Sequence, residues 1–252
     1  FNSKDSNFNT EFEKILKRGA MDIENVEGRV KELLNAIKKQ GQSAIIAQVA
    51  QFDNWNPTNF SDLKITQEQM QKAYEAIETP LKDSLQLAFE RIYAFHSKQK
   101  PKTWLDFEEN GNILGQKVTP MDRAGLYIPG GKAAYPSSLL MNAIPALVAG
   151  VKEIVVCTPT PHNEPNPLLL AAMHLCGIKE AYKIGGASAI GALAFGAQDS
   201  QGKGIQKVDV ITGPGNIYVA TAKKLVFGEV QIDMIAGPSE IGILNDGDAR
   251  AD

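Results

Sequence analysis

The apolar residues of the first hundred positions recur with the period of an α-helix. Between residues 26 and 37 they are spaced so that they share one helix face: Val26, Val30, Leu33, Leu34 and Ile37. Gly41 follows at a position where glycine commonly ends a helix. A second stripe of this kind runs through residues 81–95. The pattern predicts a helical N-terminal region.

Local signals refine that prediction. Thr66 with Gln69 matches a capping box, and Thr79-Pro80 matches an N-cap followed by a proline in the first turn. Residues 103–120 instead alternate like strands about a Glu-Asn-Gly-Asn turn at 109–112. This alternation predicts a β-hairpin that connects the helical region to the rest of the chain.

The rest of the chain alternates short apolar runs with helical segments. The runs expected to be strands are 124–128, 153–157, 180–184, 207–212 and 231–235, with 240–244 as the start of another. The segments expected to be helices are 136–149, 166–176, 187–196 and 216–227. This order predicts right-handed crossovers and a parallel sheet covered on both faces, which is a three-layer α/β/α fold.

The distribution of glycine divides the chain. All glycines except Gly19, Gly28 and Gly41 come after residue 110. We therefore expect a helical region with a hairpin in residues 1–120 and a Rossmann-like, nucleotide-binding α/β domain in residues 121–240. Residues 241–252 would begin a further segment.

The overall composition narrows the class of protein. The 252 residues are 43% hydrophobic and carry a net charge of −3, which is typical of a globular protein rather than a nucleic-acid-binding one. No apolar run is long enough to span a bilayer, and the first residues are too polar for a signal peptide. We expect a cytoplasmic protein with no nucleic-acid or membrane partner. Cys157 and Cys176, both in apolar runs, are expected to be reduced core thiols.

Three glycine-rich turns carry the candidate chemistry. "YIPGGK", "KIGGAS" and "ITGPGN" each place glycines between a predicted strand and a predicted helix: Gly130, Gly131, Gly185, Gly186, Gly213 and Gly215. At such an edge glycine lets a ligand approach the backbone, and helix N-termini attract phosphate. The turns favour a shared nucleotide cleft, although tight turns also require glycine for steric reasons. Asn216 is placed either to cap its helix or to face the ligand.

The other reactive residue types predict no catalytic apparatus. His96, His162 and His174 have no partners at metal-ligand spacing. Neither cysteine has an activating base nearby in the sequence. The turns match neither G-x-G-x-x-G nor the P-loop. From the residues alone we assign no catalytic residue and no metal ligand.

Four motifs, in order, resemble those of one family. They are "GLYIPGG" (125–131), "GGASAIGALAFG" (185–196), "GPGNIYV" (213–219) and "DMIAGPSE" (233–240). They are similar to motifs of the histidinol dehydrogenases, which depend on zinc and NAD. The resemblance implies an aldehyde-dehydrogenase-like fold and a homodimer. It also implies oxidation of L-histidinol to L-histidine through histidinaldehyde, the last steps of histidine biosynthesis.

The resemblance further implies roles for individual residues. Tyr127 and Asn216 stand where the family contacts NAD, and Ser239 stands where it contacts the substrate. Ser188 departs from the glutamine that the family usually has at another NAD-contacting position. Its shorter hydroxyl is expected to bind the cofactor less well or through water. The family's zinc ligands and catalytic Glu–His pair are expected beyond Asp252.

Two functions remain open on this basis. The chain is either the cofactor-side, N-terminal fragment of an NAD-dependent histidinol dehydrogenase, inactive alone, or a non-catalytic nucleotide-binding or interaction module derived from that fold. We favour the first, because four motifs in order are specific and the sequence ends in a polar turn.

Overall fold

The computed structural model describes residues 4–16, 20–130 and 135–236. Its helices are α1 (Phe8–Leu16), α2 (Ala20–Gln40), α3 (Gln42–Phe52), α4 (Gln67–Ala76), α5 (Thr79–Ser97), α6 (Pro136–Ala149), α7 (Pro167–Leu175), α8 (Gly186–Phe195) and α9 (Ile217–Val226), with 3₁₀ turns η1 (Phe60–Leu63) and η2 (Pro161–Asn163). Its strands are β1 (Lys64–Ile65), β2 (Trp104–Phe107), β3 (Ile113–Gln116), β4 (Arg123–Tyr127), β5 (Glu153–Thr158), β6 (Glu180–Lys183), β7 (Ala197–Gln198), β8 (Gly204–Ile205), β9 (Val210–Thr212) and β10 (Gln231–Ile232). Within these ranges no helix is long and apolar enough to cross a membrane.

A six-stranded sheet forms the middle layer, in the order β1-β6-β5-β4-β9-β10. Neighbouring strands run parallel except β1, which is antiparallel to β6. From β4 the chain adds β5 and β6 on one side, and then crosses over to add β9 and β10 on the other. The strand order therefore reverses between β4 and β9, where doubly wound sheets form ligand crevices.

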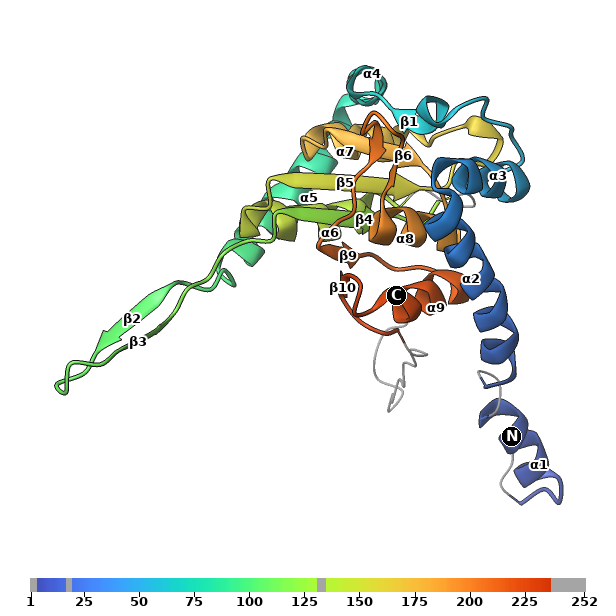
Figure 1. Ribbon diagram of the computed structural model, residues 1–252, viewed down its shortest axis with the longest axis horizontal. Helices are drawn as coiled ribbons and strands as arrows, with labels where there is room; N and C mark the ends of the chain where they lie inside the picture. The colour runs from blue at the N-terminus through green and yellow to red at the C-terminus, as the bar shows by residue number, and fades with distance from the viewer. Residues whose placement is uncertain (1–3, 17–19, 131–134, 237–252) are drawn as a thin grey trace.

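Helices cover both faces of this sheet and form two cores (Figure 1). Helices α2, α3, α8 and α9 contribute to the first core, in which Ile190 is fully buried. Helices α4, α5, α6 and α7 contribute to the second, in which Ile144 is fully buried. Successive strand residues point to opposite faces, so Val155 belongs to the first core and Val156 to the second. The predicted α/β fold with a helical N-terminal region is confirmed.

The helical pattern of the N-terminal region is also confirmed. Residues 26–37 lie within α2, which ends where Gly41 adopts φ 56° and donates its N–H to the Ile37 carbonyl at 2.8 Å. The Thr66 hydroxyl accepts the Gln69 N–H at 3.2 Å, and the Gln69 side chain accepts the Thr66 N–H at 2.9 Å. The predicted capping box therefore begins α4.

Several predicted boundaries differ from the structure. Helix α5 begins at Thr79 itself, and Glu78 is its N-cap. The strand expected over 207–212 is shorter because the Val208 N–H donates to a carbonyl of α8 instead. Strand β1 and the β7–β8 ribbon are not predicted, since two-residue strands leave no periodic pattern. The strand expected over 240–244 lies outside the described residues.

The N-terminal helices belong to the same layers as the rest of the chain. Helix α2 packs against α8 and α9, α4 against α7, and α5 against α6. Strand β1 extends the sheet. The region 1–120 therefore shares both cores with the region 121–240. The three-part division stays a prediction, and its last part, 241–252, lies outside the described residues.

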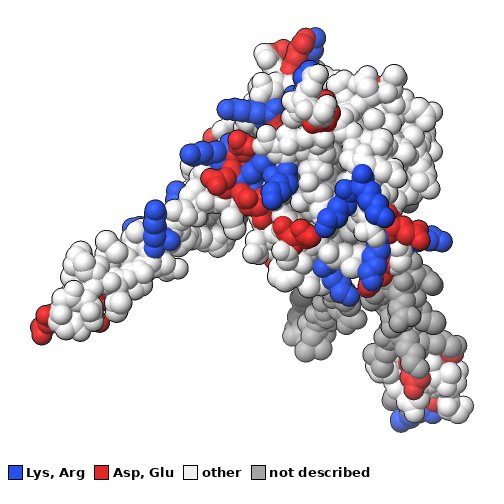
Figure 2. Space-filling view, in the orientation of Figure 1, with Lys and Arg blue, Asp and Glu red and all other residues white. Residues whose placement is uncertain are grey.

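One element leaves the body of the molecule. The predicted hairpin is confirmed as β2 and β3, joined by a turn in which Gly111 has φ 88°, and it projects far from the layers (Figure 1). Its large apolar side chains are all more than half exposed: Trp104, Leu105, Phe107, Ile113 and Leu114. Figure 2 shows few charges along this arm. The face of the hairpin seen in this view is thus mostly uncharged, and large apolar side chains are exposed on the arm.

The two ends of the strands differ in chemistry. At the amino ends, the Arg123 guanidinium forms ion pairs with Glu153 and Glu180 and so joins β4, β5 and β6. The Asp209 carboxylate accepts the backbone N–H of Arg123 at 2.8 Å. These contacts hold the strands together. The carboxyl ends carry the glycine-rich turns, where the candidate site lies.

Candidate cofactor site

A cavity of about 740 Å³ opens at the carboxyl ends of the strands. The end of β4, the turns after β5, β6 and β9 and the first turn of α8 line the cavity, together with residues of α2 and α3. It brings together Tyr127, Ser188 and Asn216, which are distant in the sequence. Its volume is that of a small-molecule site.

Tyr127 ends β4 and is 4% exposed. Its hydroxyl oxygen accepts the backbone N–H of Gly186, the first residue of α8, at 3.2 Å. Burial raises the pKa of this phenol, chiefly because the charged form would lose its solvation. The hydroxyl therefore keeps its proton and remains a donor at the cavity.

The turn after β9 is held tightly from two sides. Gly213 has φ 126°, and a Cβ there would lie 2.0 Å from the Tyr127 carbonyl oxygen. The buried Lys223 ammonium donates to the Gly213 carbonyl at 2.9 Å and forms an ion pair with Asp233. The Asp233 carboxylate accepts the Gly213 N–H at 2.9 Å. A side chain at position 213 would clash with the Tyr127 backbone. At this turn, packing is therefore enough to explain the glycine without a ligand.

Asn216, at the end of this turn, is the N-cap of α9. Its Oδ1 accepts the N–H groups of Tyr218 and Val219 at 3.1 and 3.2 Å. The side chain lies at the cavity, and among the described residues its Nδ2 has no hydrogen-bond acceptor. The cap uses the oxygen and leaves the amide N–H groups for a ligand, so the two predicted roles are compatible.

The turn before α8 is open to the cavity. A Cβ on Gly185 would lie 2.6 Å from the Cβ of Pro159, so this glycine permits close packing. Gly186 has φ 58° with open space around its Cβ position. The N-cap residue Gly185 makes no side-chain cap, and beyond the Gly186 N–H that Tyr127 accepts, the first N–H groups of α8 carry the positive end of the helix dipole. This end of the cavity favours an anionic group.

Ser188 lies in the first turn of α8 and is 3% exposed. Its hydroxyl donates to Gln48 Oε1 at 2.5 Å, and Gln48 Nε2 donates to the Leu33 carbonyl at 3.1 Å. The serine proton is therefore used within the chain. Toward the cavity Ser188 offers only acceptor lone pairs.

The family model for histidinol dehydrogenase matches residues 16–252. The chain belongs to the histidinol dehydrogenase family. It is 66% identical over 250 residues to the histidinol dehydrogenase of Wolinella succinogenes, covering 99% of this chain and 57% of the relative. With that of Helicobacter hepaticus it is 62% identical over 243 residues, covering 96% and 55%.

A solved structure of the same family shares the fold. The crystal structure of histidinol dehydrogenase from Elizabethkingia anophelis matches with a TM-score of 0.77 and 35% identity, over 87% of this chain and 49% of that one. The chain thus spans about half the length of the histidinol dehydrogenases it matches.

Two positions predicted from the sequence lie outside the described residues of this family member. Ser239 lies in the segment 237–252, and Gly131 lies in the segment 131–134. Gly130, which precedes the latter, does line the cavity. The roles implied for Tyr127 and Asn216 stay predictions, supported by their place at the cavity.

Sequence reasoning missed the wall formed by α2 and α3. Arg29, Phe52 and Asp53 line the cavity from these helices. Their neighbours in sequence form ordinary amphipathic helices, so no local signal could have found them. Asp53 differs from the others because it is 6% exposed and burial raises its pKa.

The histidines and cysteines take structural positions in the described parts of the chain. His96 pairs with Gln99, and His174 packs on the ring of Tyr74. The described residues contain no group of three His, Cys, Asp or Glu side chains that could hold a metal. Both cysteines are buried and free, and burial raises the pKa of the Cys176 thiol to about 12. Neither is poised as a thiolate.

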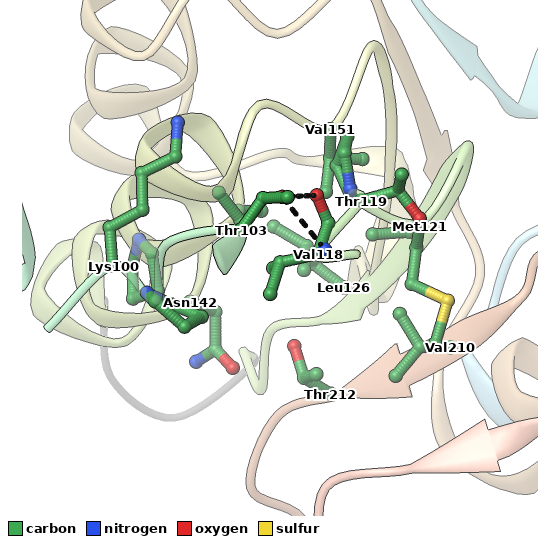
Figure 3. A pocket seen from close by; sticks show the side chains of 16 residues that line it. Lys100, Thr103, Val118, Thr119, Met121, Leu126, Asn142, Val151, Val210 and Thr212 are labelled. Carbon is green, nitrogen blue, oxygen red and sulfur yellow. Dashed lines mark hydrogen bonds between the residues drawn. The ribbon is translucent and has the colours of Figure 1, made fainter. Parts of the chain in front are cut away.

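A second hollow of about 610 Å³ lies at the base of the hairpin, beside α6 and strands β4 and β9 (Figure 3). The Thr103 hydroxyl accepts the Val118 N–H across it at 3.0 Å. Its lining is mostly apolar, and Lys100 is the charged residue among the described side chains there. The cavity at Tyr127 is the better candidate for chemistry, because residues of both charges, Arg29, Glu32 and Asp53, line it.

Proposed function

We propose that this chain is the NAD-binding part of an enzyme that oxidises L-histidinol to L-histidine through histidinaldehyde in the cytoplasm. The observation that carries the proposal is the single cavity that gathers Tyr127, Ser188 and Asn216 at the strand-order reversal. Membership of the histidinol dehydrogenase family and the names of its relatives support the reaction.

The residues of the cavity suit a dinucleotide. Because the Gly186 N–H is donated to Tyr127, the backbone N–H groups that follow it in the first turn of α8 would hold a phosphate group. The Tyr127 hydroxyl and the Asn216 amide donate hydrogen bonds to polar groups of the ligand, and Ser188 accepts one. Bound NAD would supply the hydride acceptor of the oxidation. The chain's own contribution is to bind and orient it.

The substrate and metal sides of the reaction depend on other residues. We propose that Ser239 contacts the amino-alcohol substrate. Zinc belongs to the proposal through the family, but the described residues offer no ligand cluster for it, and no step is assigned to it. A non-catalytic binding module stays the second candidate, because we assign no catalytic residue within the described ranges. Histidinol-dependent NADH formation by a protein that carries this chain together with the remaining length of its relatives would exclude it.

A homodimer is part of the same proposal. The β2–β3 hairpin exposes a continuous apolar surface away from the body of the molecule. An isolated two-stranded hairpin is only marginally stable in water. A second copy of the chain that covers this surface would stabilise it.

Titration calorimetry with NAD tests the proposed site, with the variants Asn216→Ser and Asn216→Ala. Serine keeps the helix cap but lacks the amide N–H groups, whereas alanine loses both. Asn216→Ser should melt near the parent temperature yet bind NAD roughly five- to thirty-fold more weakly. Asn216→Ala should also lose about 0.5–2 kcal/mol of stability. Parental NAD affinity in both variants would remove the turn from the site.

A further inference from the structure

Asp53 occupies an energetically unfavourable position at the cavity. It directly follows α3 as its C-cap, where the helix dipole is negative and disfavours an anion. It is 6% exposed, and within the described part of the chain no lysine or arginine pairs with it. The N–H of Thr160 favours its charged form, but burial outweighs this and raises its pKa. Such a carboxylate needs a compensating partner.

One oxygen of this carboxylate is free. Asp53 Oδ2 is buried and has no hydrogen-bond partner among the described residues. The carboxylate lies beside the turn before α8, since a Cβ on Gly185 would be 3.6 Å from Asp53 Oδ1. Its charge is close enough to contribute to the raised pKa of Tyr127. An unpaired acceptor and the donor hydroxyl of Tyr127 thus meet at one cavity.

The loop after β5 fixes Asp53 in this place. The N–H of His162 donates to the Asp53 carbonyl at 2.7 Å, and both His162 and Asn163 adopt left-handed backbone conformations. The Lys183 ammonium donates to Asn163 Oδ1 at 2.7 Å and lies 4.9 Å from the centre of the Trp55 ring. Strained backbone held by its surroundings is common at ligand sites. The carboxylate is therefore preorganised.

The charge of Asp53 selects the group it can bind. A phosphate beside Asp53 would face a carboxylate that no described lysine or arginine pairs with, and an apolar group would leave Oδ2 unpaired. Two adjacent hydroxyls can donate to a carboxylate, as a ribose diol does in other dinucleotide sites. We propose that Asp53 binds a ribose cis-diol of the dinucleotide, as a specificity residue supplied by α3. This inference rests on the proposed function of the cavity as the NAD site.

The test combines a change in the protein with a change in the ligand. Calorimetry compares the parent, Asp53→Asn and Asp62→Asn with NAD and two NAD analogues, each lacking the 2′-hydroxyl of one ribose. Asp62→Asn is the matched control, because its carboxylate caps η1 and does not line the cavity. Thermal melting verifies that each variant is folded.

We expect Asp53→Asn to weaken NAD binding by at least about ten-fold, and Asp62→Asn to leave it unchanged. The parent should bind one of the two analogues about as weakly as Asp53→Asn binds NAD. Asp53→Asn should bind that same analogue no more weakly than the parent does. That analogue identifies the ribose. The inference is overturned if folded Asp53→Asn binds NAD like the parent. It is also overturned if, for both analogues, the loss of affinity from the variant adds to the loss from the missing hydroxyl. Either result leaves the proposed NAD site unaffected. A parent chain that binds no NAD overturns both.

Discussion

Six buried polar side-chain atoms have no hydrogen-bond partner among the described residues, and one of them belongs to Asp53, which lines the candidate cofactor cavity. Of the six such atoms in the described residues, four belong to Asp53, Trp55, Thr158 and Thr160, at the end of α3 and in or just after β5. At the amino ends of the strands, two nitrogens of the buried Arg123 guanidinium are paired, and its Nε is another of the six atoms. An unpaired buried atom costs stability, and Asp53 is the residue of this set at a cavity where a ligand could supply the missing hydrogen bond.

The charge of Asp53 should make stability depend on pH. Burial raises its pKa in the folded chain above the value of about 4 expected in the unfolded chain. The folded state then holds the proton more tightly, so the free energy of unfolding decreases as pH rises from the unfolded pKa through the folded pKa. Asp53→Asn removes this loss. In urea unfolding, the stability of Asp53→Asn relative to the parent should therefore increase from pH 4 to pH 7, and a difference independent of pH would contradict the burial argument.

The strand-to-helix junctions decide how the elements form the site. The junction between β9 and α9 is held by the contact of Gly213 with the Tyr127 backbone and by the Lys223–Asp233 pair. It places Asn216 so that its oxygen caps α9. The same junction therefore begins a helix and presents a donor.

Gly213→Ala tests this junction, with Gly228→Ala as the matched control. Both glycines have positive φ, 126° and 101°, but Gly228 has no atom within 4 Å of its Cβ position. The control should lose about 1–2 kcal/mol from backbone strain alone. Gly213→Ala should lose about 3 kcal/mol or more, because the new Cβ displaces the Tyr127 backbone, and its NAD affinity should fall. Equal losses of stability in chemical denaturation would show that the close approach is unimportant.

At the scale of the whole molecule, the hairpin is the element without a core of its own. Leu105 pairs with Gly115 and Phe107 pairs with Ile113, so these residues share one face of the ribbon. This face is apolar and exposed. In a monomer it would remain in contact with water, which favours association.

The double variant Leu105→Thr/Phe107→Thr should weaken self-association at least ten-fold in sedimentation equilibrium. Threonine keeps the strand propensity while it removes apolar area. The melting temperature of the monomer should hardly change, because neither side chain contacts the cores. Asp106→Thr, on the other face of the ribbon, is the control and should associate like the parent. A parent chain that is monomeric at tens of micromolar would refute the role of the hairpin.

The sequence by itself determined the elements and the edge of the sheet that carries the site. Apolar periods of 3.6 and 2 depend on neighbours in sequence, so they predicted most of the helices, the hairpin and the parallel strands, although no separate helix was predicted at α1 or α3. The capping box at Thr66 and the turn at Gly213–Asn216 each depend on residues only a few positions apart, so the sequence predicts them as well. The motifs around Tyr127 and Asn216 identified the family for the same reason.

Only the tertiary structure decided what faces those turns. The wall that holds Asp53 comes from α3, more than seventy residues before Tyr127, and no period or motif links the two. The bond from Ser188 to Gln48 and the antiparallel addition of β1 arise in the same way. Such contacts depend on how α2 and α3 pack over the sheet. Local patterns carry no information about a partner that chain folding brings from far away in sequence.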